Sequence, residues 1–167
     1  VVSTMSVGNG AATGGISVTM LGFNFGIVDY TEFTTHVAST LCTSTEWRSD
    51  TSMRCLAPAG SAASHTVDVT VSTQTGSVSL AFSYNKPVVS TMSVGNGAAT
   101  GGISVTMLGF NFGIVDYTEF TTHVASTLCT STEWRSDTSM RCLAPAGSAA
   151  SHTVDVTVST QTGSVSL

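Results

Sequence analysis

Apolar and polar residues alternate along two neighbouring stretches of the chain. Residues 64–74 (SHTVDVTVSTQ) place valine at every second position between polar neighbours, and residues 76–84 (GSVSLAFSY) continue the pattern with larger apolar side chains. Alternation with a period of two is typical of a strand that buries one face. We therefore predict two strands here, and the sequence TQTG at residues 73–76 is expected to form the hairpin turn between them.

Two further segments read as strands. Residues 1–7 (VVSTMSV) and 14–21 (GGISVTML) form a second predicted pair, separated by a glycine-rich stretch. Residues 29–40 (DYTEFTTHVAST) are ambiguous, because Asp29 and Glu32 suit the start of a helix whereas the β-branched residues favour one or two short strands. Short strands without a strong helical stretch predict an all-β fold, a β-sandwich.

The chain repeats one unit. Residues 88–167 match residues 1–80 without a substitution, at an offset of 87 residues (88 − 1). A unit of this length can bury a core of its own. We therefore predict two tandem domains, at residues 1–87 and 88–167, of which the second lacks the final seven residues of the unit, AFSYNKP.

A short linker, Asn85, Lys86 and Pro87, joins the two predicted domains. Proline fixes its own φ and biases the preceding residue toward an extended backbone, so we expect this linker to be stiff. In the second domain the last strand stops at Leu167, before the aromatic residues that end it in the first. We expect the continuation of a longer covalent array to complete this strand, with donation from a neighbouring chain as the alternative.

Charged residues are scarce. They make up 9% of the chain, hydrophobic residues make up 41%, and the formal net charge is −5. Nucleic acid is not expected as a partner, because binding to phosphates requires a basic patch. No apolar run approaches the ~20 residues of a transmembrane helix, so no membrane insertion is expected in this segment. Ser and Thr supply most of the polar surface, which suits exposed strands and the attachment of sugars.

Each unit carries two cysteines, Cys42 with Cys55 and Cys129 with Cys142, and both pairs are thirteen residues apart. An even number of cysteines locked to the repeat favours one disulfide per unit, and hence an extracellular or cell-surface location. Two reduced, buried thiols are the alternative. A zinc site would need more ligands at a closer spacing.

Candidate residues for catalysis or metal binding are few. His36 and His65 are of the type that forms triads or metal sites, but the chain has neither a G-x-S-x-G nor an H-E-x-x-H motif. A calcium site at Asp29 and Glu32 has too few clustered carboxylates. The glycine-rich VGNGAATGG leads into a strand and lacks the Lys-Ser/Thr end of a phosphate-binding loop. We therefore predict no catalytic residue, no cofactor, no metal site and no enzyme.

Three features of the unit occur together in one known domain family. Residues 14–26 (GGISVTMLGFNFG) combine a strand with a G-x-N-F-G sequence, a cysteine pair flanks a turn before Pro58, and the unit closes on FSYNKP. In these features the unit resembles the IPT/TIG domain, the immunoglobulin-like fold of plexins and some transcription factors. The resemblance implies two tandem immunoglobulin-like β-sandwich domains, and the low charge favours the extracellular members over the DNA-binding ones.

The G-x-N-F-G sequence predicts a sharp corner of the backbone. Gly22 and Gly26 bracket the sequence Phe-Asn-Phe, so the chain can turn while one or both rings are buried beneath it. Trp47 is expected to pack beside the disulfide in the sandwich core.

An unchanged repeat favours a structural role. A receptor whose domains meet different partners needs distinct domains, whereas a polymer makes the same contact at each one. When each domain is related to the next by the same rotation and translation, the array forms a rod or an open helix. We therefore predict an extracellular structural protein, a segment of a long array that forms or coats a surface fibril and has itself as partner. An adhesion or ligand-binding ectodomain is the alternative.

Covalent glycans are expected to be O-linked, because none of Asn9, Asn24 and Asn85 lies in an N-x-Ser/Thr sequon. The sequence PAGSAASHT places hydroxyl residues among small ones after a proline, which favours O-glycosylation. The candidates are Ser61, Ser64 and Thr66 in the first unit and Ser148, Ser151 and Thr153 in the second.

Overall fold

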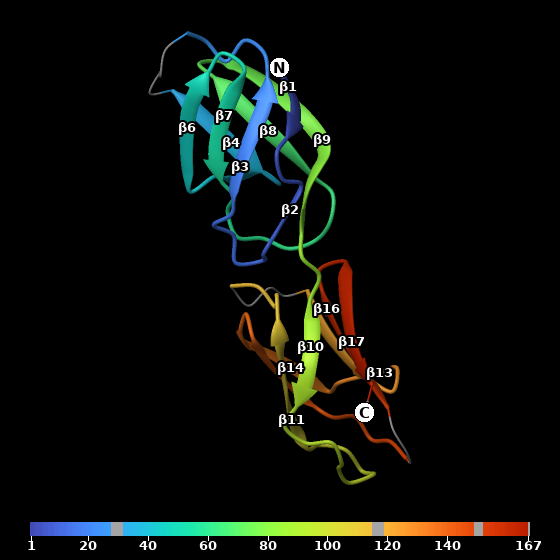
Figure 1. Ribbon diagram of the computed structural model, residues 1–167. Coiled ribbons are helices and arrows are strands. Elements are labelled where there is room, and N and C mark those ends of the chain that lie inside the picture. Colours follow the sequence, from blue (N-terminus) through green and yellow to red (C-terminus); the bar gives the residue numbers. More distant parts are fainter. Residues whose placement is uncertain (28–31, 115–118, 149–151, 167) are drawn as a thin grey trace. The chain divides into compact units, whose positions relative to one another are not determined.

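β-Strands supply the regular structure of the chain. The computed structural model describes residues 1–27, 32–114, 119–148 and 152–166, and within these ranges it contains strands and no helix (Figure 1). Contacts between Cα atoms divide the chain into two compact units, Val1–Asn85 and Lys86–Leu167. Each unit is described below by itself.

The first unit is built from two sheets. Its strands are β1 (Val2–Met5), β2 (Asn9–Gly10), β3 (Ser17–Gly22), β4 (Phe33–Val37), β5 (Thr40–Leu41), β6 (Ser44–Ser49), β7 (Ser52–Leu56), β8 (His65–Val71) and β9 (Gln74–Tyr84). One sheet has the order β1-β3-β7-β6 and the other the order β2-β9-β8-β4-β5. The pairing of β2 with β9 is parallel, and the other pairs of this unit are antiparallel.

Alternating side chains of both sheets form one core. Val67 and Val69 of β8 are buried, as the period of two predicts. Val18, Met20 and Met53 of the other sheet are buried in the same cluster. Because the inner faces of the two sheets share this cluster, the first unit is a β-sandwich.

The second unit repeats this arrangement with one short strand fewer among its described residues. Its strands are β10 (Val88–Met92), β11 (Ser104–Phe110), β12 (Phe120–Val124), β13 (Thr127–Leu128), β14 (Ser131–Ser136), β15 (Ser139–Leu143), β16 (Thr153–Val158) and β17 (Gln161–Ser166). They form two sheets, of order β10-β11-β15-β14 and β13-β12-β16-β17. Val154 and Val156, the counterparts of the two β8 valines, are buried in its core cluster. The prediction of an all-β chain with two tandem immunoglobulin-like sandwiches is confirmed.

The turn of the β8–β9 hairpin differs from the prediction. Val71 pairs with Gln74, so the loop consists of Ser72 and Thr73 alone. Ser72 supplies the left-handed backbone that the turn requires, with a φ of 56°. The predicted turn at residues 73–76 is therefore wrong, because residues 74–76 already belong to β9.

The ambiguous segment at residues 29–40 is extended where the structure describes it. Residues 33–37 form β4 and residues 40–41 form β5, so the strand alternative is correct for these residues. Asp29 lies outside the described residues.

Candidate functional site

A disulfide ties together the two sheets of each unit. The bonds Cys42–Cys55 and Cys129–Cys142 join Cα atoms that are 5.9 Å apart, and they use all four cysteines. In the first unit the Cys42 amide donates to the Thr35 carbonyl of β4 (2.8 Å), whereas Cys55 lies in β7 of the other sheet. Trp47 is half-buried and packs against the core cluster that contains both cysteines. Such bonds persist in oxidising compartments, and they leave no thiol for catalysis or metal binding.

The G-x-N-F-G corner separates its two phenylalanines. Phe25 is 1% exposed, whereas Phe23 is 62% exposed. Asn24 takes the left-handed conformation, with a φ of 65°. Asp50 holds the corner, because its backbone carbonyl accepts from the Phe25 amide (2.9 Å) and its carboxylate accepts from the Gly26 amide (3.0 Å). The corner therefore buries one ring and presents the other to solvent.

The linker residues are each held by one unit. The Asn85 amide donates to the Gly10 carbonyl of the first unit at 2.7 Å. The Lys86 carbonyl accepts from Nδ2 of Asn111 in the second unit at 3.2 Å. Pro87 follows within the second unit. The first unit therefore ends at Asn85 and the second begins at Lys86, so only the backbone torsions between these two residues connect the units.

The candidate glycosylation residues differ in accessibility. Ser64, Ser148 and Thr153 are exposed, Ser61 and Thr66 are half-buried, and Ser151 lies outside the described residues. An exposed hydroxyl outside a strand is more accessible to a modifying enzyme than one within a strand. Ser64 and Ser148 meet both conditions and are therefore the better candidates for glycosylation.

The structure places His36 and His65 on strands. His36 of β4 lies opposite Asp68 of β8, and Nε2 of His65 is 2.7 Å from the Ser61 carbonyl oxygen. Among the described residues, no three His, Cys, Asp or Glu side chains gather in a group that could hold a metal ion. The calcium hypothesis involved Asp29, which is not among those residues. Within the same ranges, no helix has the length and apolar character to span a membrane.

One end of the first unit is filled by aromatic side chains. β9 bends at Leu80, which is 75% exposed with a φ of 54°, and the strand then carries Phe82 and Tyr84 into the core. Both aromatic residues are 1% exposed, and their rings meet edge to face at 5.2 Å. The Tyr84 hydroxyl donates to the buried Pro58 carbonyl (2.9 Å).

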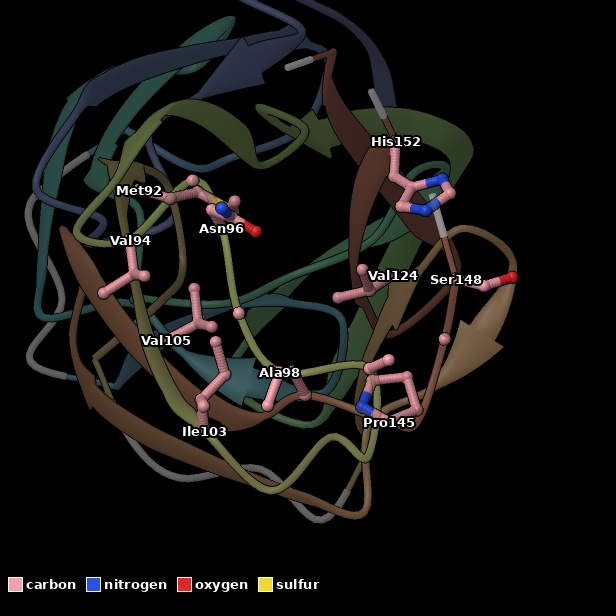
Figure 2. Close-up of a pocket in the computed structure, with 15 residues that line it drawn as sticks. Met92, Val94, Asn96, Ala98, Ile103, Val105, Val124, Pro145, Ser148 and His152 are labelled. Carbon is pink, nitrogen blue, oxygen red and sulfur yellow. The ribbon is translucent and has the colours of Figure 1, made fainter. Parts of the chain in front are cut away.

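At the same end of the second unit these two aromatic side chains have no counterpart within the sequence, which runs to Leu167. A groove of about 470 Å³ lies there, lined by residues of the segments 92–99, 103–105 and 144–148 together with Val124 and His152. Figure 2 shows the side chains of Met92 and Val105 on one side of this space and those of Val124 and His152 on the other. The groove lies where Phe82 and Tyr84 lie in the first unit, at the place where the sequence analysis expects the last strand to be completed by continuation of the chain or by a neighbouring chain.

Comparisons with known proteins agree with this architecture. Among solved structures, a surface glycan-binding protein from Prevotella bryantii is 14% identical to the chain, with a TM-score of 0.64 over 98% of the chain and 40% of that protein. The full extracellular region of plexin A4 is 18% identical, with a TM-score of 0.46 over 89% of the chain and 13% of that region. The chain thus spans less than half the length of either structure. At this identity the likeness to the glycan-binding protein shows a shared fold alone.

A family model gives the more specific result. No curated protein matches the chain. The model of the IPT/TIG domain, however, matches residues 1–84 and again residues 87–167, so it covers nearly the whole of both units. The resemblance noted in the sequence is confirmed, and the chain belongs to the IPT/TIG domain family.

Proposed function

We propose that this chain is a segment of an extracellular, non-enzymatic array of tandem IPT/TIG domains that forms or coats a surface fibril. The observation that carries the proposal is the unchanged repeat together with the anchored linker. Residues 88–167 repeat residues 1–80 without a substitution, so every surface of one unit recurs in the next. Identical units joined head to tail make identical contacts, which is what a filament uses and a set of distinct receptor sites does not.

The anchored linker supports a regular step between units. Asn85 is hydrogen-bonded to the first unit and Lys86 to the second, so no residue between them is free of both. Pro87 adds a fixed φ directly after these anchors. Because so few backbone torsions of the linker are free, we expect the same rotation and translation to relate each unit to the next along the array.

The surface and the disulfides support an extracellular location. One disulfide per unit is suited to an oxidising compartment. The scarcity of charge supports lateral pairing of neighbouring arrays, because weakly charged surfaces resist association poorly. Covalent O-linked glycans at Ser64 and Ser148 would then supply the solvation that charge does not; intact mass of native material equal to that of the unmodified chain would refute this part.

The regular step is tested by a distance distribution between the two units. Spin labels are placed through non-natural residues at Leu41 and its counterpart Leu128, both 53% exposed, so that the disulfides stay intact. Double electron-electron resonance should give a narrow distribution. A control chain with a flexible Gly-Ser insertion after Asn85 should give a broad one. Equal breadth in the two chains would refute the structural role of the linker.

The length of the native polypeptide tests the array itself. Material from the source is reduced, denatured and sized. A very large or ladder-like species supports a covalent array, whereas a species of about this chain's mass, 17.1 kDa, would refute it.

An adhesion or ligand-binding ectodomain is the second candidate, and one observation favours it. Each unit exposes large apolar side chains beside the G-x-N-F-G corner: Phe23 is 62% and Ile27 82% exposed, and the counterparts Phe110 and Ile114 are 59% and 47% exposed. Exposed apolar groups that gather at one place commonly mark interaction sites. A surface glycan-binding protein shares the fold, which makes glycans the first ligands to screen. Specific binding that a Phe23→Ser and Phe110→Ser variant loses would favour this candidate over the fibril.

A further inference from the structure

The strand β6 forms one edge of a sheet in the first unit. The order β1-β3-β7-β6 places it at the end of that sheet, and among the described residues no strand other than β7 pairs with it. Its counterpart β14 has the same place in the order β10-β11-β15-β14. Both strands read Ser-Thr-Glu-Trp-Arg-Ser. Because an edge strand presents backbone groups that can pair with another strand, each unit carries the same potential docking edge.

The backbone groups of Trp47 point to this edge. In an antiparallel pair, residues whose backbone groups bond across the pair alternate with residues whose groups do not. The Ala57 amide donates to the Ile16 carbonyl on the side of β3, so every second residue of β7 counted from Ala57 also faces β3. Arg54 is therefore turned toward β6, where it pairs with Glu46. The next residue of β6, Trp47, directs its amide and carbonyl away from β7.

The side chains before and after Trp47 carry opposite charges. Glu46 and Arg48 are 50% and 49% exposed, and Oε2 of the first is 2.9 Å from Nη2 of the second, so both lie on one face of β6. Glu133 and Arg135 of the second unit form the same ion pair at 2.9 Å. An edge with charges of one sign would repel a second copy of itself, because like charges directly opposite each other destabilise a strand pair. The order Glu-Trp-Arg is instead complementary to its own reverse.

We propose that β6 binds the same edge of a second copy of this chain, as an antiparallel pair centred on Trp47. The two-fold relation places Glu46 of each copy opposite Arg48 of the other and the two Trp47 residues opposite each other. Opposite charges and aromatic pairs both stabilise neighbouring strands. The register of β6 with β7 shifts between Trp47 and Ser49, so the pairing is confined to residues 46–48.

This inference names the surface for the lateral pairing of arrays proposed above, and it rests on that proposal. Three residue pairs make a weak contact, but an array repeats the edge in every unit. Where two arrays align their units, each further contact forms within the same complex, so the contacts together hold far more tightly than one alone. We therefore expect weak association of the 167-residue chain and strong association of longer arrays.

The test changes the charge pattern of the edge in both units. Glu46→Arg with Glu133→Arg makes a positive edge, and Arg48→Glu with Arg135→Glu makes a negative one. Sedimentation equilibrium at up to about 1 mM should show self-association of the unchanged chain, and each variant alone should associate at least about tenfold more weakly. An equimolar mixture of the two variants should regain the association, because each arginine of one edge then lies opposite a glutamate of the other.

Two controls separate this contact from general charge effects. Each variant changes the formal net charge of −5 by four, so both chains remain negative and do not attract each other through net charge. A chain with Glu46→Arg and Arg48→Glu together, and the same exchange at residues 133 and 135, keeps opposite charges around the tryptophan and should associate like the unchanged chain. Thermal unfolding at low concentration verifies that each variant folds, since exposed ion pairs contribute at most about 1 kcal/mol.

Three outcomes would overturn the proposal. Undiminished self-association of both single-sign variants, or a mixture that stays monomeric, would assign lateral pairing to another surface. An unchanged chain that stays monomeric at about 1 mM would exclude the edge contact itself. The covalent array is decided separately by the size of the native polypeptide, so its failure and the failure of this contact are distinguishable.

Discussion

Removal of one disulfide is a direct measure of what holds each sandwich together. In the first unit Cys42 and Cys55 are 6% and 1% exposed, and their bond links β7 of one sheet to the chain segment held against β4 of the other. The double change Cys42→Ala and Cys55→Ala removes this link and little side-chain volume. The second unit offers a matched control in Cys129 and Cys142, which have the same separation of 13 residues.

The expected loss follows from the length of the closed loop. A loop of this size restricts the unfolded chain by about 3 kcal/mol in the entropic account of disulfides. Total stabilities of small domains are about 5–15 kcal/mol, so the bond supplies a large share of the stability of a unit. For a domain of this size such a loss lowers Tm by roughly 12–24 °C. Because the loops are equal in the two units, the loss should also be equal.

Urea unfolding is monitored by tryptophan fluorescence in chains that keep one tryptophan, so that Trp47 alone reports the first unit after Trp134→Phe and Trp134 alone reports the second after Trp47→Phe. Each double variant should shift the transition of its own unit and leave that of the other in place. Reduction of the unchanged chain by a thiol should shift both. A loss below about 1 kcal/mol in either unit, with the bond itself confirmed by peptide mapping, would refute the entropic reasoning.

Three further predictions concern single side chains, each measured by urea unfolding. Tyr84→Phe removes the donor to the buried Pro58 carbonyl and should cost about 1–3 kcal/mol; no loss would show that water replaces the hydroxyl. Phe25→Ala should cost about 3–5 kcal/mol, whereas Phe23→Ala, in the exposed position of the same corner, should stay within about 0.5 kcal/mol; similar losses would refute this division. Glu46→Gln breaks half-exposed ion pairs and should cost at most about 1 kcal/mol; a larger loss would reveal a network.

Features with a strong local signal could be predicted from the sequence. The alternating valines of β8 gave a strand with the correct buried face, because the period of side chains in a strand is fixed at two. The repeated cysteine pair also predicted the disulfide correctly. Each unit contains only two cysteines, so only one pairing within a unit is possible.

Features that depend on the tertiary fold could not be predicted. Phe23 and Phe25 lie two residues apart in one motif, and only the packing of the corner against Asp50 decides which ring is buried. The turn after β8 was placed too late because Gly76 resembles a turn residue, whereas the register of the hairpin puts it inside β9. The parallel pairing of β2 with β9 joins residues 74 positions apart, and two residues of strand carry no periodic signal.

The boundary between sequence repeats also differs from the boundary between folded units. The sequence period restarts at Val88, after Lys86 and Pro87. By their contacts, however, these two residues belong to the second unit, because Lys86 accepts a hydrogen bond from Asn111 and a Cβ on Gly163 would collide with the Pro87 carbonyl. The folded unit therefore uses the last two residues of one sequence period to secure the beginning of the next. An array cut at the sequence boundary would separate these residues from the sandwich that holds them, so expression of single units should begin at Lys86 rather than at Val88.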